Sequence, residues 1–108
     1  MNDLLFEISD TMKRFDIVKT DNQFSIEWLG RSPRLYSWAK ATGNPPAMDV
    51  LVGLYNRLDI LRSKYEQTGE IDNAAIIDDL TDRLWDGIRS ESLSRTYFRR
   101  KVRSSSVA

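Results

Sequence analysis

Apolar residues recur along this chain at spacings of three and four, and no long stretch alternates apolar with polar residues. Spacing of this kind places apolar side chains on one face of an α-helix, whereas strict alternation would indicate a strand. In the first such segment, residues 3–15, the apolar stripe consists of Leu4, Leu5, Ile8, Met12 and Phe15. The pattern predicts an all-α protein of about five helices.

Two short helices are predicted next, over residues 22–29 and 33–41. Gly30 stops the first, since glycine readily adopts the conformation that ends a helix. Ser32 precedes the second as its expected side-chain cap, and Gly43 follows it. These residues therefore predict two helices joined by a turn of three residues.

Two longer helices complete the pattern. One begins at residue 46 or 47 and ends before Gly69, with a leucine-rich face, and is expected to be the central helix of the core. The other follows Asp72 or Asn73. Its apolar pattern weakens after Ser90, so we expect the serine-rich run at 90–94 to break it.

Two short helices, a tight turn and a longer supporting helix form the arrangement of a DNA-binding helix-turn-helix. Residues 23–37, QFSIEWLGRSPRLYS, resemble the second helix, turn and recognition-helix start of the Cro/C1-type repressor family. Residues 46–58, PAMDVLVGLYNRL, are similar to that family's fourth helix. The Leu-Gly-Arg-Ser-Pro turn also looks like that of a group of small, mostly uncharacterised bacterial proteins.

The resemblance covers roughly residues 1–60 and implies a repressor-like fold that binds double-stranded DNA. Phe24-Ser25 lies one residue earlier, relative to the turn glycine, than the Leu-Ala pair usual in the family, so the second helix is expected to differ in register. Arg34 could pair with the edge of a guanine. The candidate nucleic-acid-binding residues are Gln23, Arg31, Ser32, Arg34, Ser37, Lys40 and Asn44.

Composition excludes several kinds of chemistry. The 108 residues include no Cys and no His, so thiol nucleophiles, cysteine-ligated zinc and the commonest acid-base group are absent from the sequence. No nucleophile, phosphate-binding loop or metal-ligand spacing accompanies the many acidic residues. We therefore expect a cytoplasmic protein that is not an enzyme, does not enter a membrane, and needs no cofactor or metal.

A net charge of zero hides strong segregation along the chain. Residues 28–65 carry six basic and two acidic groups, residues 66–88 carry one and seven, and residues 89–108 carry six and one. The basic segment favours DNA as the partner. The acidic segment favours the alternative, a protein-interaction module, either adaptor or inhibitor, on a helix-turn-helix fold that no longer binds DNA.

Three parts follow from this reading: a helix-turn-helix core over 1–65, a C-terminal helical extension over 66–98, and a basic, disordered tail over 99–108. One short recognition helix contacts few base pairs, so we expect a homodimer. The extension either forms the dimer interface or folds back onto its own core. Its candidate interface residues are Ile77, Leu80, Leu84, Trp85 and Ile88.

Overall fold

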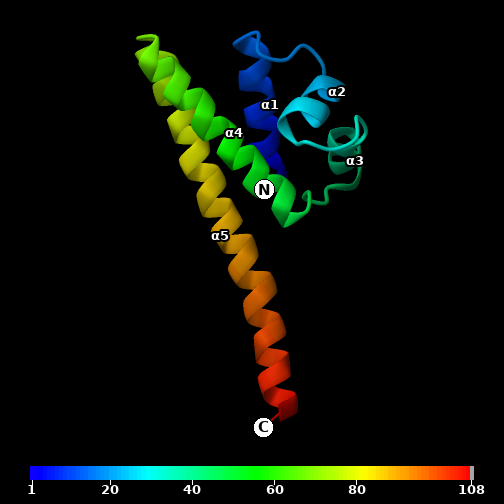
Figure 1. Cartoon of the computed structure of the whole chain (residues 1–108). Helices are drawn as coiled ribbons and strands as arrows, with labels where there is room; N and C mark the ends of the chain where they lie inside the picture. Colours follow the sequence, from blue (N-terminus) through cyan, green and yellow to red (C-terminus); the bar gives the residue numbers. More distant parts are fainter. Residues whose placement is uncertain (108) are drawn as a thin grey trace.

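A computed structural model describes residues 1–107, with side chains described for residues 1–93, and shows an all-α molecule of five helices (Figure 1). No strand occurs in this range, as the apolar spacing predicts. The elements are α1 (Asn2–Arg14), α2 (Asp21–Gln23) with the π-helical turn η1 (Phe24–Trp28), α3 (Leu35–Thr42), α4 (Met48–Gln67) and α5 (Ile71–Val107).

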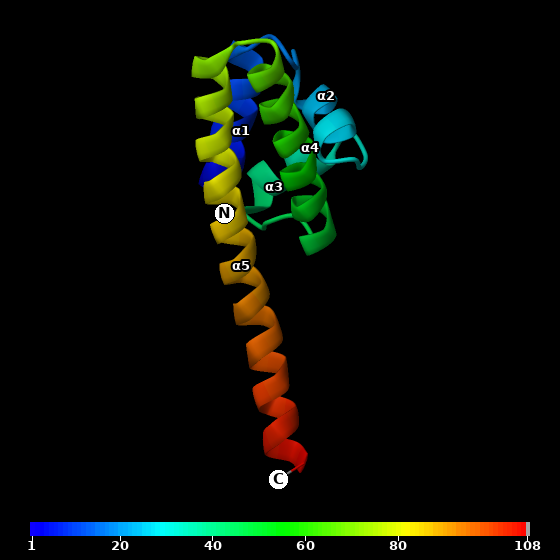
Figure 2. The same ribbon diagram turned by 60° about the vertical axis from the view of Figure 1, so that its left-hand side comes forward.

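Helices α4 and α5 form an antiparallel hairpin, and α1 packs against α5 (Figures 1 and 2). The turn η1 packs on α4 and on α3. Figure 1 shows α2 and α3 at the side of α1 and α4 that is away from α5. The two short helices therefore rest on a larger three-helix support.

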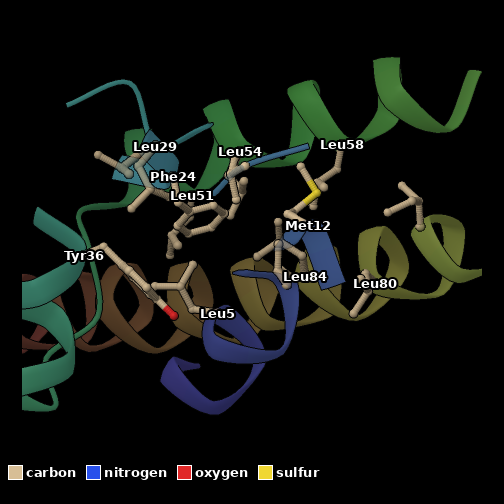
Figure 3. Packing of buried hydrophobic residues seen from close by; sticks show 14 of the residues in the cluster. Leu5, Met12, Phe24, Leu29, Tyr36, Leu51, Leu54, Leu58, Leu80 and Leu84 are labelled. Carbon is tan, nitrogen blue, oxygen red and sulfur yellow. The ribbon is translucent and has the colours of Figure 1, made fainter. Parts of the chain in front are cut away.

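The core lies where these helices meet, and Figure 3 shows its main side chains. The short helices and α4 share one part of this core, in which five side chains are buried: Leu29, Tyr36, Leu51, Leu54 and Leu58. Leu5, Ile8 and Met12 contribute the predicted stripe of α1. Burial of such apolar surface supplies most of the free energy that favours the fold.

The second helix starts one residue earlier than predicted, at Asp21, and it ends in a π-helical turn. Thr20 caps it, because the Thr20 hydroxyl accepts a hydrogen bond from the Gln23 amide at 3.1 Å. Further along, the Leu29 amide donates to the Phe24 carbonyl at 3.1 Å, which is the five-residue spacing of a π-helical turn. Such a turn holds one more residue than an α-helical turn.

The segment that joins the two short helices, residues 29–34, is longer than the predicted three-residue turn. Gly30 ends η1 with a φ of +67°, which favours glycine. The Arg57 guanidinium from α4 fills the space beside it and donates a hydrogen bond to the Trp28 carbonyl at 3.2 Å. A Cβ at residue 30 would lie 2.8 Å from Arg57 Nη2, so the end of that flexible side chain would have to shift, and it is the positive φ that favours glycine here.

Helix α3 begins at Leu35 rather than at Pro33, and the predicted cap at Ser32 is wrong. Ser32 contributes only its carbonyl, which accepts a hydrogen bond from the Leu35 amide at 3.2 Å. The cap comes instead from η1: the buried Ser25 hydroxyl accepts a hydrogen bond from the Tyr36 amide at 2.8 Å. An amide in the first turn of α3 that lacks an intrahelical partner is thereby satisfied by a side chain from the preceding helix.

The predicted break at 90–94 is also wrong, because the backbone of α5 is helical without interruption as far as Val107. Serines lower helix propensity only slightly, and residues 89–107 contain neither glycine nor proline to end the helix. The side chains of 94–107, and residue 108 altogether, lie outside the described part. The disordered tail over 99–108 is not tested and stays a sequence-based prediction.

Replacing Ser25 by alanine should destabilise the fold by about 1–3 kcal/mol, since the buried Tyr36 amide would lose its acceptor. The matched control is Ser32→Ala, which removes an exposed hydroxyl that caps nothing and should change the free energy of unfolding by no more than ~0.5 kcal/mol. Urea unfolding of the two variants measures both values. Equal effects would show that Ser25 does not cap α3.

Candidate nucleic-acid interface

The exposed side of α3 and the residue before it present Arg34, Ser37, Trp38 and Ala41 to solvent, at the three- and four-residue spacing of one helix face. The opposite side of the helix is buried through Tyr36 and Ala39. The Trp38 side chain is 46% exposed, which is unusual for so large an aromatic residue. This face is therefore a mixed surface of one cation, small polar groups and one aromatic ring.

The two arginines near the start of α3 differ in their partners. Arg31 forms an ion pair with Asp49, in the first turn of α4, and both side chains are more than half exposed. The Arg34 guanidinium has neither a hydrogen bond nor an ion pair with any of the described residues, and the side chain is exposed. Ser32 and Ser37 are exposed as well. The structure thus brings three of the predicted residues, Ser32, Arg34 and Ser37, together at the N-terminal end of α3.

Lys40 projects from the last turn of α3 back toward α2. Its ammonium group donates to Asp21 at 3.0 Å and lies 5.3 Å from the centre of the Tyr36 ring. Lys13 on α1 donates to the same carboxylate at 2.6 Å. These hydrogen bonds, that of Lys13 above all, lower the pKa of Asp21, and the hydrogen bond to Asp21 raises the pKa of Lys40.

Gln23 and Asn44 both take part in local backbone hydrogen bonds. The Gln23 side-chain oxygen accepts from the Lys19 amide at 2.7 Å, which helps to end the loop before α2. Through its backbone, Asn44 accepts from the Asn2 side chain at 3.3 Å and donates to the Thr42 hydroxyl at 3.2 Å. The side-chain amide of Asn44 is exposed and remains open to a ligand.

The structure shows two acidic partners of the candidate cations that the sequence analysis did not predict. Asp49 pairs with Arg31, and Asp21 pairs with Lys40, so two of the three basic residues in 28–48 are partly neutralised. Asp49 is distant from Arg31 in sequence, and only its place in the first turn of α4, directly after the two short helices, could have indicated it. No sequence spacing relates Asp21 to Lys40.

The acidic segment of α5 does not cover α3. Among its acids, Asp79 pairs with Arg83 on the same helix, and Arg83 also binds Glu7 of α1 at 2.6 Å. Asp78 lies 3.6 Å from Arg62 of α4. The negative charge is thus compensated in part by α1, α4 and α5 themselves.

Four of the five candidate dimer residues of α5 are buried against their own chain, as expected if the extension folds back onto the core. Ile77, Leu80, Leu84 and Ile88 are at most 4% exposed and fill the core of their own chain. They cannot contact a second copy while α5 stays in place. Only Trp85, at 43% exposed, remains available on the surface.

The described residues contain no group of three or more Asp, Glu, His or Cys that could hold a metal ion. Within the same part of the chain, no helix combines the length and the apolar character needed to cross a bilayer.

These features describe a small helical protein in which a short exposed helix is held on a three-helix support. The chain belongs to the DUF6626 family, a family of unknown function, which matches residues 5–101. No curated protein matches the chain. No solved structure matches it either.

The lowered pKa of Asp21 makes stability depend on pH. Its carboxylate stabilises the folded state while it is ionised, so this contribution is complete above the ordinary pKa of 3.8 and is lost as pH falls through the lowered value. Asp21→Asn should therefore be less stable than the wild type at neutral pH and equal to it in strong acid.

Urea unfolding across this pH range gives the comparison. The control is Glu27→Gln, which removes an exposed acid with no ion pair among the described side chains and should leave the pH dependence unchanged. If the deficit of Asp21→Asn persisted undiminished in strong acid, the ion pairs with Lys13 and Lys40 would not be its cause.

Proposed function

We propose that this chain is a small, sequence-specific DNA-binding transcriptional regulator, a cytoplasmic homodimer that places α3 in the major groove. The observation that supports this most is the unpaired, exposed Arg34 at the start of a short helix whose buried face is fixed by Ser25 and Tyr36. A rigid helix with a free guanidinium at its exposed N-terminal end suits the reading of base edges. The activity needs no metal, cofactor or catalytic group.

The exposed residues divide by role. Arg34 pairs with guanine, and Ser32 and Ser37 lie beside it on the side that would face the bases. Arg31, Lys40, Gln23 and Asn44 surround this group and would contact phosphates.

Two of these surrounding residues, Arg31 and Lys40, already pair with carboxylates. Exposed ion pairs of this kind contribute only about 0–1 kcal/mol. A phosphate can therefore replace Asp49 or Asp21 as the partner at little cost.

Selection of bound duplexes from a random pool should enrich one sequence, and two substitutions should then act differently on it. Arg34→Ala should lower discrimination at one base position by about 1–3 kcal/mol. Lys40→Ala should weaken all duplexes alike and reduce the salt dependence by about one ion, because phosphate contacts are the same on every sequence.

Lys64→Ala is the matched control for loss of charge. Lys64 is exposed in the last turn of α4, at the opposite end of that helix from Asp49. Its removal should leave both the base discrimination and the salt dependence of DNA binding unchanged. If no sequence is enriched and affinity stays near ~10⁻⁵ M at physiological salt, the chain binds DNA only non-specifically and the regulator proposal fails.

The exposure of Trp38 favours a second candidate function, docking of a protein partner on the same face of α3. Tryptophan is among the residues that contribute most at protein interfaces, and it is not a usual reader of base edges. In this alternative, Trp38 enters a pocket of the partner and Arg34 lies at the rim of the contact.

Trp38→Ala should abolish capture of such a partner from an extract of the source cells. Ile60→Ala should leave capture intact, since Ile60 is also an exposed apolar residue but lies in the second half of α4. Loss of the partner with both variants would indicate general apolar adhesion and would remove this second candidate.

A further inference from the structure

The outer side of α5 carries an apolar surface that no described element covers. Trp85 and Leu93 are 43% and 65% exposed. They line one shallow hollow together with Ile88, Arg89 and Ser92. Large apolar residues gathered in a hollow, with polar residues at its edge, are typical of an interaction surface.

The Trp85 ring is held in position before any partner arrives. It lies against Tyr55 of α4, with ring centroids 5.1 Å apart. An aromatic side chain that is fixed in the free protein loses little conformational entropy on binding, which suits it to be the anchor of an interface.

Helix α5 also continues past the body of the molecule. Ile88 is its last buried residue among residues 1–93, and the final turns extend beyond all other helices in both views (Figures 1 and 2), along the 56 Å long axis of the molecule. An isolated helix of about 12–15 residues is only marginally stable in water, and helices in proteins are stabilised chiefly by packing. This extension would gain stability from a second helix beside it.

The distribution of charge along α5 indicates which helix would pack beside it. Residues 78–86 contain four acids, Asp78, Asp79, Asp82 and Asp86, and one base. Residues 92–100 contain three arginines and no acid. Asp82 and Asp86 have no ion-pair partner among residues 1–93. The acidic and basic segments are equally long and lie at equal distances from residue 89 on either side.

We propose that α5 binds α5 of a second copy of this chain, antiparallel, about a two-fold axis near Arg89. Trp85 of each copy then packs on Leu93 of the other, and residues 78–86 of each copy lie along residues 92–100 of the other. Each Arg89 lies near the axis, where Asp86 of the second copy is within one helical turn. A parallel pair would instead place acid beside acid and base beside base.

This arrangement specifies the homodimer of the proposed function but does not depend on DNA. The interface uses the exposed side of α5, so the buried stripe of Ile77, Leu80, Leu84 and Ile88 stays in the core of each chain. Self-association is measured without DNA, and DNA binding can be scored separately on monomeric variants. Failure of one proposal is therefore distinguishable from failure of the other.

Sedimentation equilibrium of the full chain at micromolar concentrations should show a dimer that weakens as salt is added. Leu93→Ala should weaken it by about tenfold or more, as expected when a central apolar contact is truncated. Ile76→Ala is the control, because Ile76 is also exposed on α5 but lies half a turn around the helix from Trp85. Circular dichroism checks that each variant keeps its helices.

Charge reversal tests the pairing. Asp82→Lys with Asp86→Lys should disrupt the dimer, and adding Arg99→Glu and Arg100→Glu to the same chain should restore it. A monomer at all concentrations, a dimer indifferent to Leu93→Ala, or no recovery in the fourfold variant would each overturn the proposal.

Orientation can be read from single cysteines, since the natural chain has none. Arg89→Cys should give a disulfide-linked dimer, because the two copies of residue 89 meet at the axis. Asp78→Cys should not, because its two copies would lie about 33 Å apart along the helices, far beyond the ~7 Å that a disulfide spans. Cross-linking at residue 78 would show a parallel pair and refute the antiparallel arrangement.

Discussion

The hydrogen bond from the Tyr36 amide to the Ser25 hydroxyl, 2.8 Å long and wholly buried, determines where α3 begins and how it is turned. Helix α3 has no side-chain cap of its own, so without this bond its first turn would leave a buried donor unsatisfied. Because Tyr36 faces inward at the bond, Arg34, Ser37 and Trp38 face outward. The candidate interface is therefore a consequence of a contact made on the opposite side of the helix.

Contacts from two other helices complete the placement. Arg57 of α4 fixes the joining segment through the Trp28 carbonyl, and Asn2 of α1 donates to the Ala39 carbonyl near the end of α3. Each contact is a side chain that reaches a backbone group, so the short helices are positioned by polar anchors as well as by the core. The exposed cations Arg31 and Lys40 are held more weakly, by surface ion pairs.

Features that depend on a single helix could be predicted from the sequence. The leucine face of α4 and the glycine that ends α3 follow from spacing and from local backbone preference. Features for which residues distant in sequence compete, such as the cap of α3, could not be predicted. Ser32 has the better local position for a cap, yet Ser25 caps α3 because the fold brings it there. The pairing of Asp49 and Asp21 with the candidate cations, and the exposure of Trp85 beside four buried neighbours, likewise depend on how the helices pack.

The π-helical turn at η1 gives the second helix a tolerance for changes in length. Its extra residue is accommodated within one wide turn, while Phe24 and Leu29 at its two ends remain in the core. A chain of this family that lacks one residue here can close the same turn as an ordinary α-helix and keep both ends in place. When sequences of the family are aligned, a one-residue gap in this helix is thus compatible with an unchanged fold, and need not be read as a sign of a different structure.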